Sequence, residues 1–168
     1  GGDVRKGRDG VTLEELKSSY DWVEAFGEGS GGNTDKTTEA VGACDPSPPM
    51  LADVVEILAF RDGENDEKNW IGVFRVADGR FVYVDAGCDF TGWDCRASNS
   101  LTVAADLRSL VVMGMTDEAR QEFPQIVRSA LWPSSIREDA PPGIAADWLH
   151  DQGDEGAALL LRKLEATT

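Results

Sequence analysis

Histidine, cysteine and long apolar runs are all scarce in this sequence, and each shortage argues against a class of protein. One histidine, His150, stands in 168 residues, so zinc sites and catalytic triads that need histidine are disfavoured. Three cysteines are an odd number and too few for a disulfide framework. No apolar run reaches the roughly 18 residues of a membrane span. We therefore expect a cytoplasmic protein that carries no cofactor and no metal.

Basic residues are also scarce, with 16 Lys and Arg against 31 Asp and Glu and a net charge of −15. The excess is evenly spread. Residues 1–50, 51–100 and 101–168 carry 5 basic and 10 acidic, 5 and 10, and 6 and 11 residues, which is −5 each. Nucleic acids and anionic membranes attract clustered Lys and Arg, so we expect neither direct nucleic-acid binding nor membrane binding. Such a charge favours solubility, and it also attracts a protein partner with a basic surface.

The chain begins with a polar segment and one clear helix signal. Residues 1–10 are rich in glycine and charge, and we expect them to be a disordered or extended lead-in to a single domain over residues 11–168. Thr12 and Glu15 have the spacing of a capping box, which predicts a helix that ends at the next glycine. Residues 27–50 are rich in Gly, Ser, Thr and Pro, so an irregular stretch is expected there.

Runs of β-branched and aromatic residues then predict an antiparallel meander of three strands, over residues 53–60, 70–76 and 81–86. The dipeptide Asp78-Gly79 is a tight-turn signal between the last two runs. Residues 101–104 would add a fourth strand at the edge. Because side chains alternate along a strand, Val82 and Val84 should share one face, with Tyr83 on the other.

The remainder of the chain has helical patterns. Asp106, Thr116 and Pro124 stand where helices commonly begin. A helical hairpin is predicted over about residues 143–166, and its apolar stripe should be buried and structural. The sequence thus predicts an α+β fold with a small antiparallel sheet of three or four strands, packed against N-terminal and C-terminal helices.

The stretch AGCDFTGWDC, residues 86–95, follows the last predicted strand and is unusual for a loop. Cys, Phe and Trp contribute most free energy when buried, so such a loop is either a packed plug or a binding site. In a plug, Phe90 and Trp93 would be buried. In a site, Trp93 would stack on a ligand or a partner. Cys88 and Cys95 would be a disulfide in one alternative and buried thiols in the other.

Acidic residues in and beside this stretch are the candidate functional groups. Asp85, Asp89 and Asp94 could bind a hard cation or act as an acid–base pair, or they could cap turns through the backbone. A second acidic loop is a rival cation site and contains Asp62, Glu64, Asp66 and Glu67. We take Asp85, Asp89, Trp93 and Asp94 as the predicted binding residues. No catalytic residue and no metal ligand is assigned.

Two segments resemble known sequences. WIGVFRVADGRFVYVDAGCDFTGWDC resembles a group of uncharacterised proteins in actinobacteria and their phages, which carry a similar GCDYTGWDC element after a hairpin. ADWLHDQGD, residues 146–154, resembles the ADWLEERGD-type helical element of many bacterial proteins. Neither resemblance implies a catalytic residue.

Two functional hypotheses follow. The first is a small acidic protein without chemistry of its own, which binds a protein partner as an inhibitor or accessory factor and belongs to a phage or another mobile element. The alternative is a protein that binds a small molecule or a divalent metal, or a hydrolase, centred on residues 85–95. The lack of a nucleophile–base pair and of a cofactor motif favours the first hypothesis.

Overall fold

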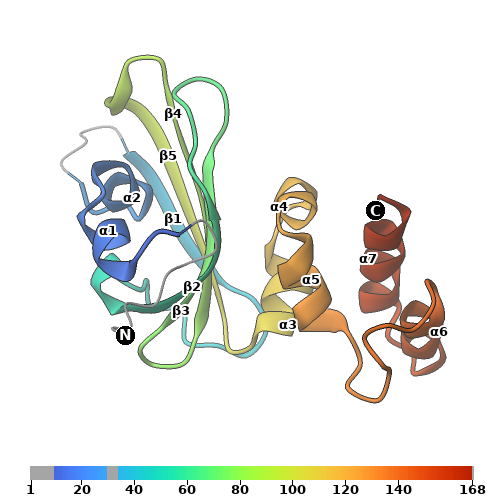
Figure 1. The fold of residues 1–168 in the computed structure, drawn as a ribbon. Coiled ribbons are helices and arrows are strands. Elements are labelled where there is room, and N and C mark those ends of the chain that lie inside the picture. Colours follow the sequence, from blue (N-terminus) through green and yellow to red (C-terminus); the bar gives the residue numbers. More distant parts are fainter. Residues whose placement is uncertain (1–9, 30–33, 168) are drawn as a thin grey trace.

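The computed structural model describes residues 10–29 and 34–167, which form an α+β fold around one five-stranded sheet (Figure 1). The strands lie in the order β1-β5-β4-β3-β2. Strands β2 to β5 form an antiparallel meander, and β1 pairs with β5 in parallel. The strands are β1 Thr34–Ala40, β2 Val54–Arg61, β3 Trp70–Val76, β4 Phe81–Asp89 and β5 Gly92–Ala104.

The predicted α+β class and the three predicted antiparallel strands are confirmed. The turn between β3 and β4 uses Gly79 at a φ of 94°, a conformation that glycine adopts without strain. Asp78 Oδ1 accepts a hydrogen bond from the Arg80 amide at 3.0 Å. Val82 and Val84 are buried on one face and Tyr83 on the other, as the alternation predicted.

The sheet was predicted to have three or four strands, all antiparallel. It has five, and one pair is parallel. β1 lies in the stretch predicted to be irregular. Its sequence TDKTTEA has no apolar alternation because it is an edge strand, in which Lys36, Thr37 and Glu39 are exposed. β5 has 13 residues and lies between β1 and β4, so residues 101–104 are not an edge strand. The first half of β5 is polar and largely exposed on one face. No helix of residues 10–29 and 34–167 covers the sheet there (Figure 1).

Helices cover both faces of the sheet, and a further pair lies outside them (Figure 1). One face carries α1 Leu13–Ser18 and α2 Tyr20–Ala25. The other face carries α3 Leu107–Ser109, the π-helix η2 Leu110–Gly114, α4 Asp117–Glu122 and α5 Pro124–Leu131. The outer pair is α6 Ile144–Asp151 and α7 Glu155–Ala166. A 3-10 helix, η1, spans Leu51–Asp53 before β2.

The predicted first helix is interrupted. The capping box of Thr12 and Glu15 is present, with the Glu15 amide 3.1 Å from Thr12 Oγ1. Ser19 then ends α1 and caps α2, because its hydroxyl accepts a hydrogen bond from the Trp22 amide at 3.3 Å. Serine offers the backbone this alternative to a continuous helix, so two short helices replace the single one predicted.

The two helices expected at the C-terminal end are present as α6 and α7. Gly153, at a φ of 82°, follows α6, and Asp154 caps α7 by accepting a hydrogen bond from the Ala157 amide at 3.4 Å. Leu160 and Leu161 are buried in the core on the α3–α5 side of the sheet. Within residues 10–29 and 34–167, no helix has both the length and the apolar character that a membrane span requires.

Candidate functional site: an acidic shelf at the hairpin end of the sheet

Two connections between strands meet at one end of the sheet, the β4–β5 hairpin and the β2–β3 connection over residues 62–69 (Figure 1). The Asp66 amide donates a hydrogen bond to the Cys88 carbonyl oxygen at 2.8 Å. The Cys88 thiol donates to Asn65 Oδ1 at 3.2 Å. The β2–β3 connection is therefore held against β4, and the two segments form one surface.

The hairpin apex is a tight turn that presents an aromatic side chain. Asp89 Oδ1 accepts hydrogen bonds from the Thr91 amide, at 2.9 Å, and from the Thr91 hydroxyl. These two hydrogen bonds, the hydroxyl first, lower the pKa of Asp89. Phe90 is 77% exposed at the apex, so it is not buried as the plug alternative required. The prediction of a loop over residues 86–95 was wrong, because β4 ends at Asp89 and β5 begins at Gly92, so only Phe90 and Thr91 lie between the two strands.

Trp93 lies on the opposite side of the hairpin from the open surface and is buried. Its exposed fraction is 3%, and its ring centroid is 4.8 Å from that of Trp70. Its indole Nε1 donates to the Asp21 carboxylate at 3.0 Å. The pairing of β4 with β5 passes from Asp89–Gly92 to Cys88–Ala97, so residues 93–96 form a bulge. Burial of Trp93, the plug prediction, is confirmed for this residue alone.

Asp85 lies on the α3–α5 side and is fixed by two donors. The Tyr83 hydroxyl donates to Asp85 Oδ2 at 2.9 Å, and Asn69 Nδ2 donates to Oδ1 at 2.7 Å. Burial raises the pKa of Tyr83, and the charge of Asp85 raises it further, so the phenol keeps its proton and continues to donate. A Cβ on Gly87 would lie 2.1 Å from Asn69 Oδ1, so the close approach of Asn69 requires glycine there.

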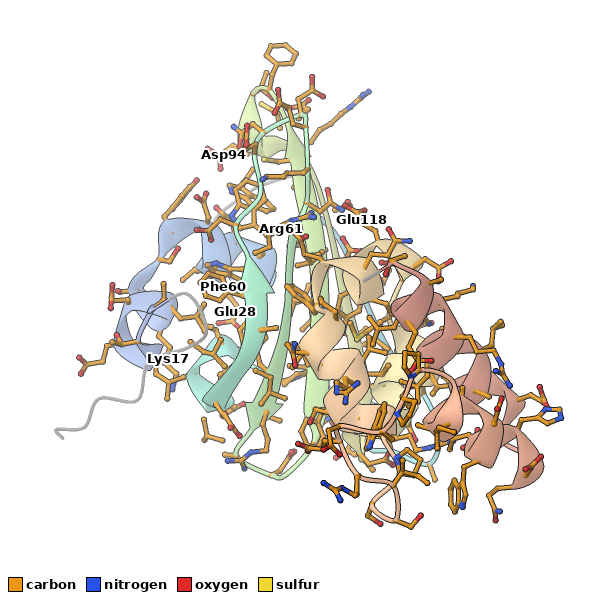
Figure 2. The ribbon with its side chains drawn as sticks, turned by 45° about the vertical axis from the view of Figure 1, so that its right-hand side comes forward. Lys17, Glu28, Phe60, Arg61, Asp94 and Glu118 are labelled. Atoms are coloured by element: carbon orange, nitrogen blue, oxygen red, sulfur yellow. The ribbon has the colours of Figure 1, made fainter. Side chains whose placement is uncertain are left out.

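On the α3–α5 side β4 changes from apolar to polar within two residues, although Ile71 of β3, opposite Asp85, is still buried. Val73 and Tyr83 are paired across β3 and β4, and both are buried beneath helices. Two residues nearer the hairpin end, Asp85 is paired with Ser100 of β5 and both are partly exposed. Arg61 marks the border, since its guanidinium binds Glu118 of α4 at 3.2 Å (Figure 2). Beyond this border no helix covers this face within the described part of the chain (Figure 1).

An open hollow of about 790 Å³ lies in this uncovered region. It is lined by Glu64, Asp66, Glu67, Asn69, Gly87, Cys88, Asp89, Cys95, Arg96, Ala97 and Ser98. We call its four carboxylates, with the adjacent Asp85, the acidic shelf: Glu64, Asp66, Glu67, Asp85 and Asp89. Of the described residues that line the hollow, Arg96 is the one with a positive charge.

Glu64 and Glu67 are close enough to affect each other. The pKa of Glu67 is raised, first by a side-chain hydrogen bond with Glu64 and then by the negative charge of Glu64. Lys68 Nζ lies 3.7 Å from Glu64 Oε1 and offsets part of this repulsion. A cation supplied from outside would stabilise both carboxylates in the charged form.

The structure separates the predicted binding residues. Asp85 and Asp89 lie on the acidic shelf, whereas Trp93 faces the α1–α2 side. Asp94 is exposed near α2, where burial and then the charge of Asp94 raise the pKa of Tyr20 (Figure 2). The shelf residues that were not chosen as binding residues are Glu64, Asp66 and Glu67, although their loop had been noted as acidic. Only the register of β3 against β4 brings that loop to Asp85 and Asp89.

The chemistry available at this end is limited. All three cysteines are free thiols, but Cys95 is exposed and Cys88 is only partly buried, so the expectation of two buried thiols was wrong. Burial raises the pKa of Cys88, so its thiol is a weak nucleophile at neutral pH. Among residues 10–29 and 34–167, no three His, Cys, Asp or Glu side chains come together as metal ligands.

Comparison with protein-family models, with curated proteins and with solved structures gives no match for this chain.

Proposed function

We propose that this protein binds a protein partner with a basic surface, through the acidic shelf and the adjoining hairpin apex, and that it performs no chemistry of its own. It would act as an inhibitor or accessory factor. The resemblance of its central stretch to actinobacterial and phage proteins supports a role in a phage or another mobile element.

The observation that carries the proposal is the charge of the uncovered sheet face. The acidic shelf has five carboxylates from two connected segments, and Arg96 is the cation that borders the same hollow. Complementary charge accelerates the encounter with a partner and selects against partners of the wrong sign. A net charge of −15 adds a long-range attraction of the same sign.

Rigidity of the shelf is a second argument. Asp85 is held by Tyr83 and Asn69, and Asp89 is held by Thr91, so two of the carboxylates are ordered before any partner arrives. Preorganised groups lose less conformational entropy on binding. Phe90 adds an exposed aromatic ring beside this charge, and aromatic side chains are enriched at protein interfaces.

A charge-reversal experiment tests the proposal. The double variant Glu64→Lys/Glu67→Lys changes the shelf, and Glu138→Lys/Asp139→Lys makes the same change in net charge in the exposed connection between α5 and α6. Each protein is immobilised, partners from a bacterial lysate are identified by mass spectrometry, and the leading partner is purified for affinity measurements at several salt concentrations.

We expect a basic partner that binds the wild type and the control variant with similar affinity and the shelf variant at least tenfold more weakly. Affinity for the wild type should fall as salt rises. Retention of the partner by the shelf variant, or a partner with an acidic surface, would contradict the proposal.

A further inference from the structure

A second cavity, which shares no lining residue with the hollow of the acidic shelf, lies between α4, α5 and the C-terminal end of α7. It has a volume of about 310 Å³. Val127, Leu160 and Leu164 supply apolar side chains, and Asp117, Arg120, Gln121 and Lys163 supply polar ones. α4 has only six residues, so it does not extend far enough to fill the space between α5 and α7.

The charge of this cavity differs from that of the molecule as a whole. Arg120 and Asp117 pair with each other at 2.7 Å, which leaves Lys163 as a positive charge without an ion pair among the described residues. The end of α7 contributes a partial negative charge of about half a unit, which is smaller than the full charge of the ammonium group. The cavity is therefore a net cationic spot on a protein of net charge −15.

Arg120 connects the cavity to an irregular helix. Its guanidinium donates to the carbonyl oxygens of Val111, at 2.8 Å, and Val112, at 3.2 Å. Both residues belong to the π-helix η2, a rare geometry that is frequent at functional sites. These hydrogen bonds hold Arg120 in place, so the polar side of the cavity is ordered without a ligand.

We infer that this cavity binds a small amphiphilic carboxylate, with its apolar body between Val127, Leu160 and Leu164 and its carboxylate beside Lys163. A water molecule occupies about 30 Å³ in the liquid, so the cavity has room for about ten non-hydrogen atoms. Small-molecule sites are typically concave, mostly apolar and fitted with a few polar groups, and this cavity is at the small end of their range.

Octanoate, with an eight-carbon chain, is the probe that tests this inference. Its binding is followed by amide chemical shifts in two-dimensional NMR spectra of the full chain, with 1-octanol and octylammonium as probes of the same length and different head group. We expect saturable shifts confined to α4, α5 and the end of α7. The affinity for octanoate should exceed that for octylammonium at least fivefold.

Matched variants of α7 locate the site. Lys163→Glu should weaken octanoate binding at least fivefold, whereas Arg162→Glu, which changes the same charge beside Asp147 and outside the cavity, should change it less than twofold. Leu164→Gln should also weaken binding, and Leu159→Gln, at an exposed position on the same helix, should not. Melting curves of each variant confirm that it is folded.

Several results would overturn the inference. They are the absence of saturable binding at millimolar octanoate, shifts scattered over the surface, equal affinity for the three head groups, and equal loss in the Leu164→Gln and Leu159→Gln variants. None of these outcomes depends on a partner for the acidic shelf, so this site and the proposed function succeed or fail separately.

Discussion

The two faces of the sheet differ most at the hairpin end. On the α1–α2 side the apolar core continues to the hairpin end of the sheet. There Trp70 of β3 packs against Trp93 of β5, and Ala97 is buried. On the α3–α5 side the apolar core reaches Ile71 on β3 but stops at Tyr83 on β4, beyond which β4 carries Asp85 and Asp89 of the acidic shelf. β4 and β5 therefore contribute side chains both to a closed core and to an open polar surface.

This difference shows how a binding surface can be built on a stable strand pair. Side chains alternate along β4 and β5, so every second residue can serve the core while the residues between them serve the surface. The core on one side fixes the backbone that positions the carboxylates on the other. A change at Trp93 should therefore affect stability, and a change on the shelf should affect binding.

The strongest test of this division is Trp93→Ala. Trp93 is buried against Trp70, and emptying a buried aromatic site lowers the free energy of unfolding by about 3–5 kcal/mol. The loss of the hydrogen bond to Asp21 adds to this effect. Denaturant unfolding measures it, and Phe90→Ala at the exposed hairpin apex serves as the control, with an expected change within about 0.5 kcal/mol. Equal effects of the two changes would refute the division.

The outer helical layer offers the next test. Leu160 lies in the core on the α3–α5 side, whereas Leu159 is 54% exposed on the same helix. Leu160→Ala should lower the free energy of unfolding by about 2–4 kcal/mol, because it removes buried methyl groups and leaves a cavity. Leu159→Ala should change it by less than about 0.5 kcal/mol. If both changes are small, the helical hairpin contributes little to the core, contrary to what its burial indicates.

The sequence predicted the elements better than their assembly. Capping residues such as Thr12, Asp106 and Thr116 act within one turn of helix, so their local pattern was sufficient. β1 was missed because an edge strand needs no apolar face, and its pairing with β5 joins residues far apart in the chain. No local pattern records such a contact.

The sequence predicted only part of the candidate site, for a related reason. Asp85 and Asp89 were identified, but Trp93 and Asp94 were grouped with them because all four are near in sequence. Strand alternation and the bulge separate them in space. The acidic residues of the β2–β3 connection join the shelf through the register of β3 against β4, a tertiary contact that composition does not encode.

A smaller effect is expected from Tyr83→Phe, at the border between the core and the shelf. The change removes the hydroxyl that donates to Asp85 and lies 3.2 Å from Thr116 Oγ1, but it preserves the ring in the core. Loss of such a hydrogen bond costs about 1 kcal/mol. Thermal and denaturant unfolding measure the stability. Affinity for the partner should fall as well, because Asp85 loses one of its two donors. A loss of stability as large as that of Trp93→Ala would show that the border lies nearer the hairpin end than the burial pattern indicates.

The smallest expected effect is a change in titration on the shelf itself. Glu67 has a raised pKa because of its hydrogen bond with Glu64 and the charge of Glu64, so Glu64→Gln should lower the pKa of Glu67 toward its ordinary value. Folding raises this pKa, so the folded state holds the proton more tightly than the unfolded chain. The pair therefore destabilises the protein above the folded pKa, and the destabilisation disappears as the pH falls below the unfolded pKa.

NMR titration of the side-chain carboxyl carbons measures the shift, with Glu138→Gln as a control far from the shelf. An unchanged Glu67 titration in Glu64→Gln would mean that the two carboxylates do not share a site. A basic partner should have the same effect as the variant, because its cation favours the charged form of Glu67. Binding should then release a proton and strengthen as the pH rises through this range.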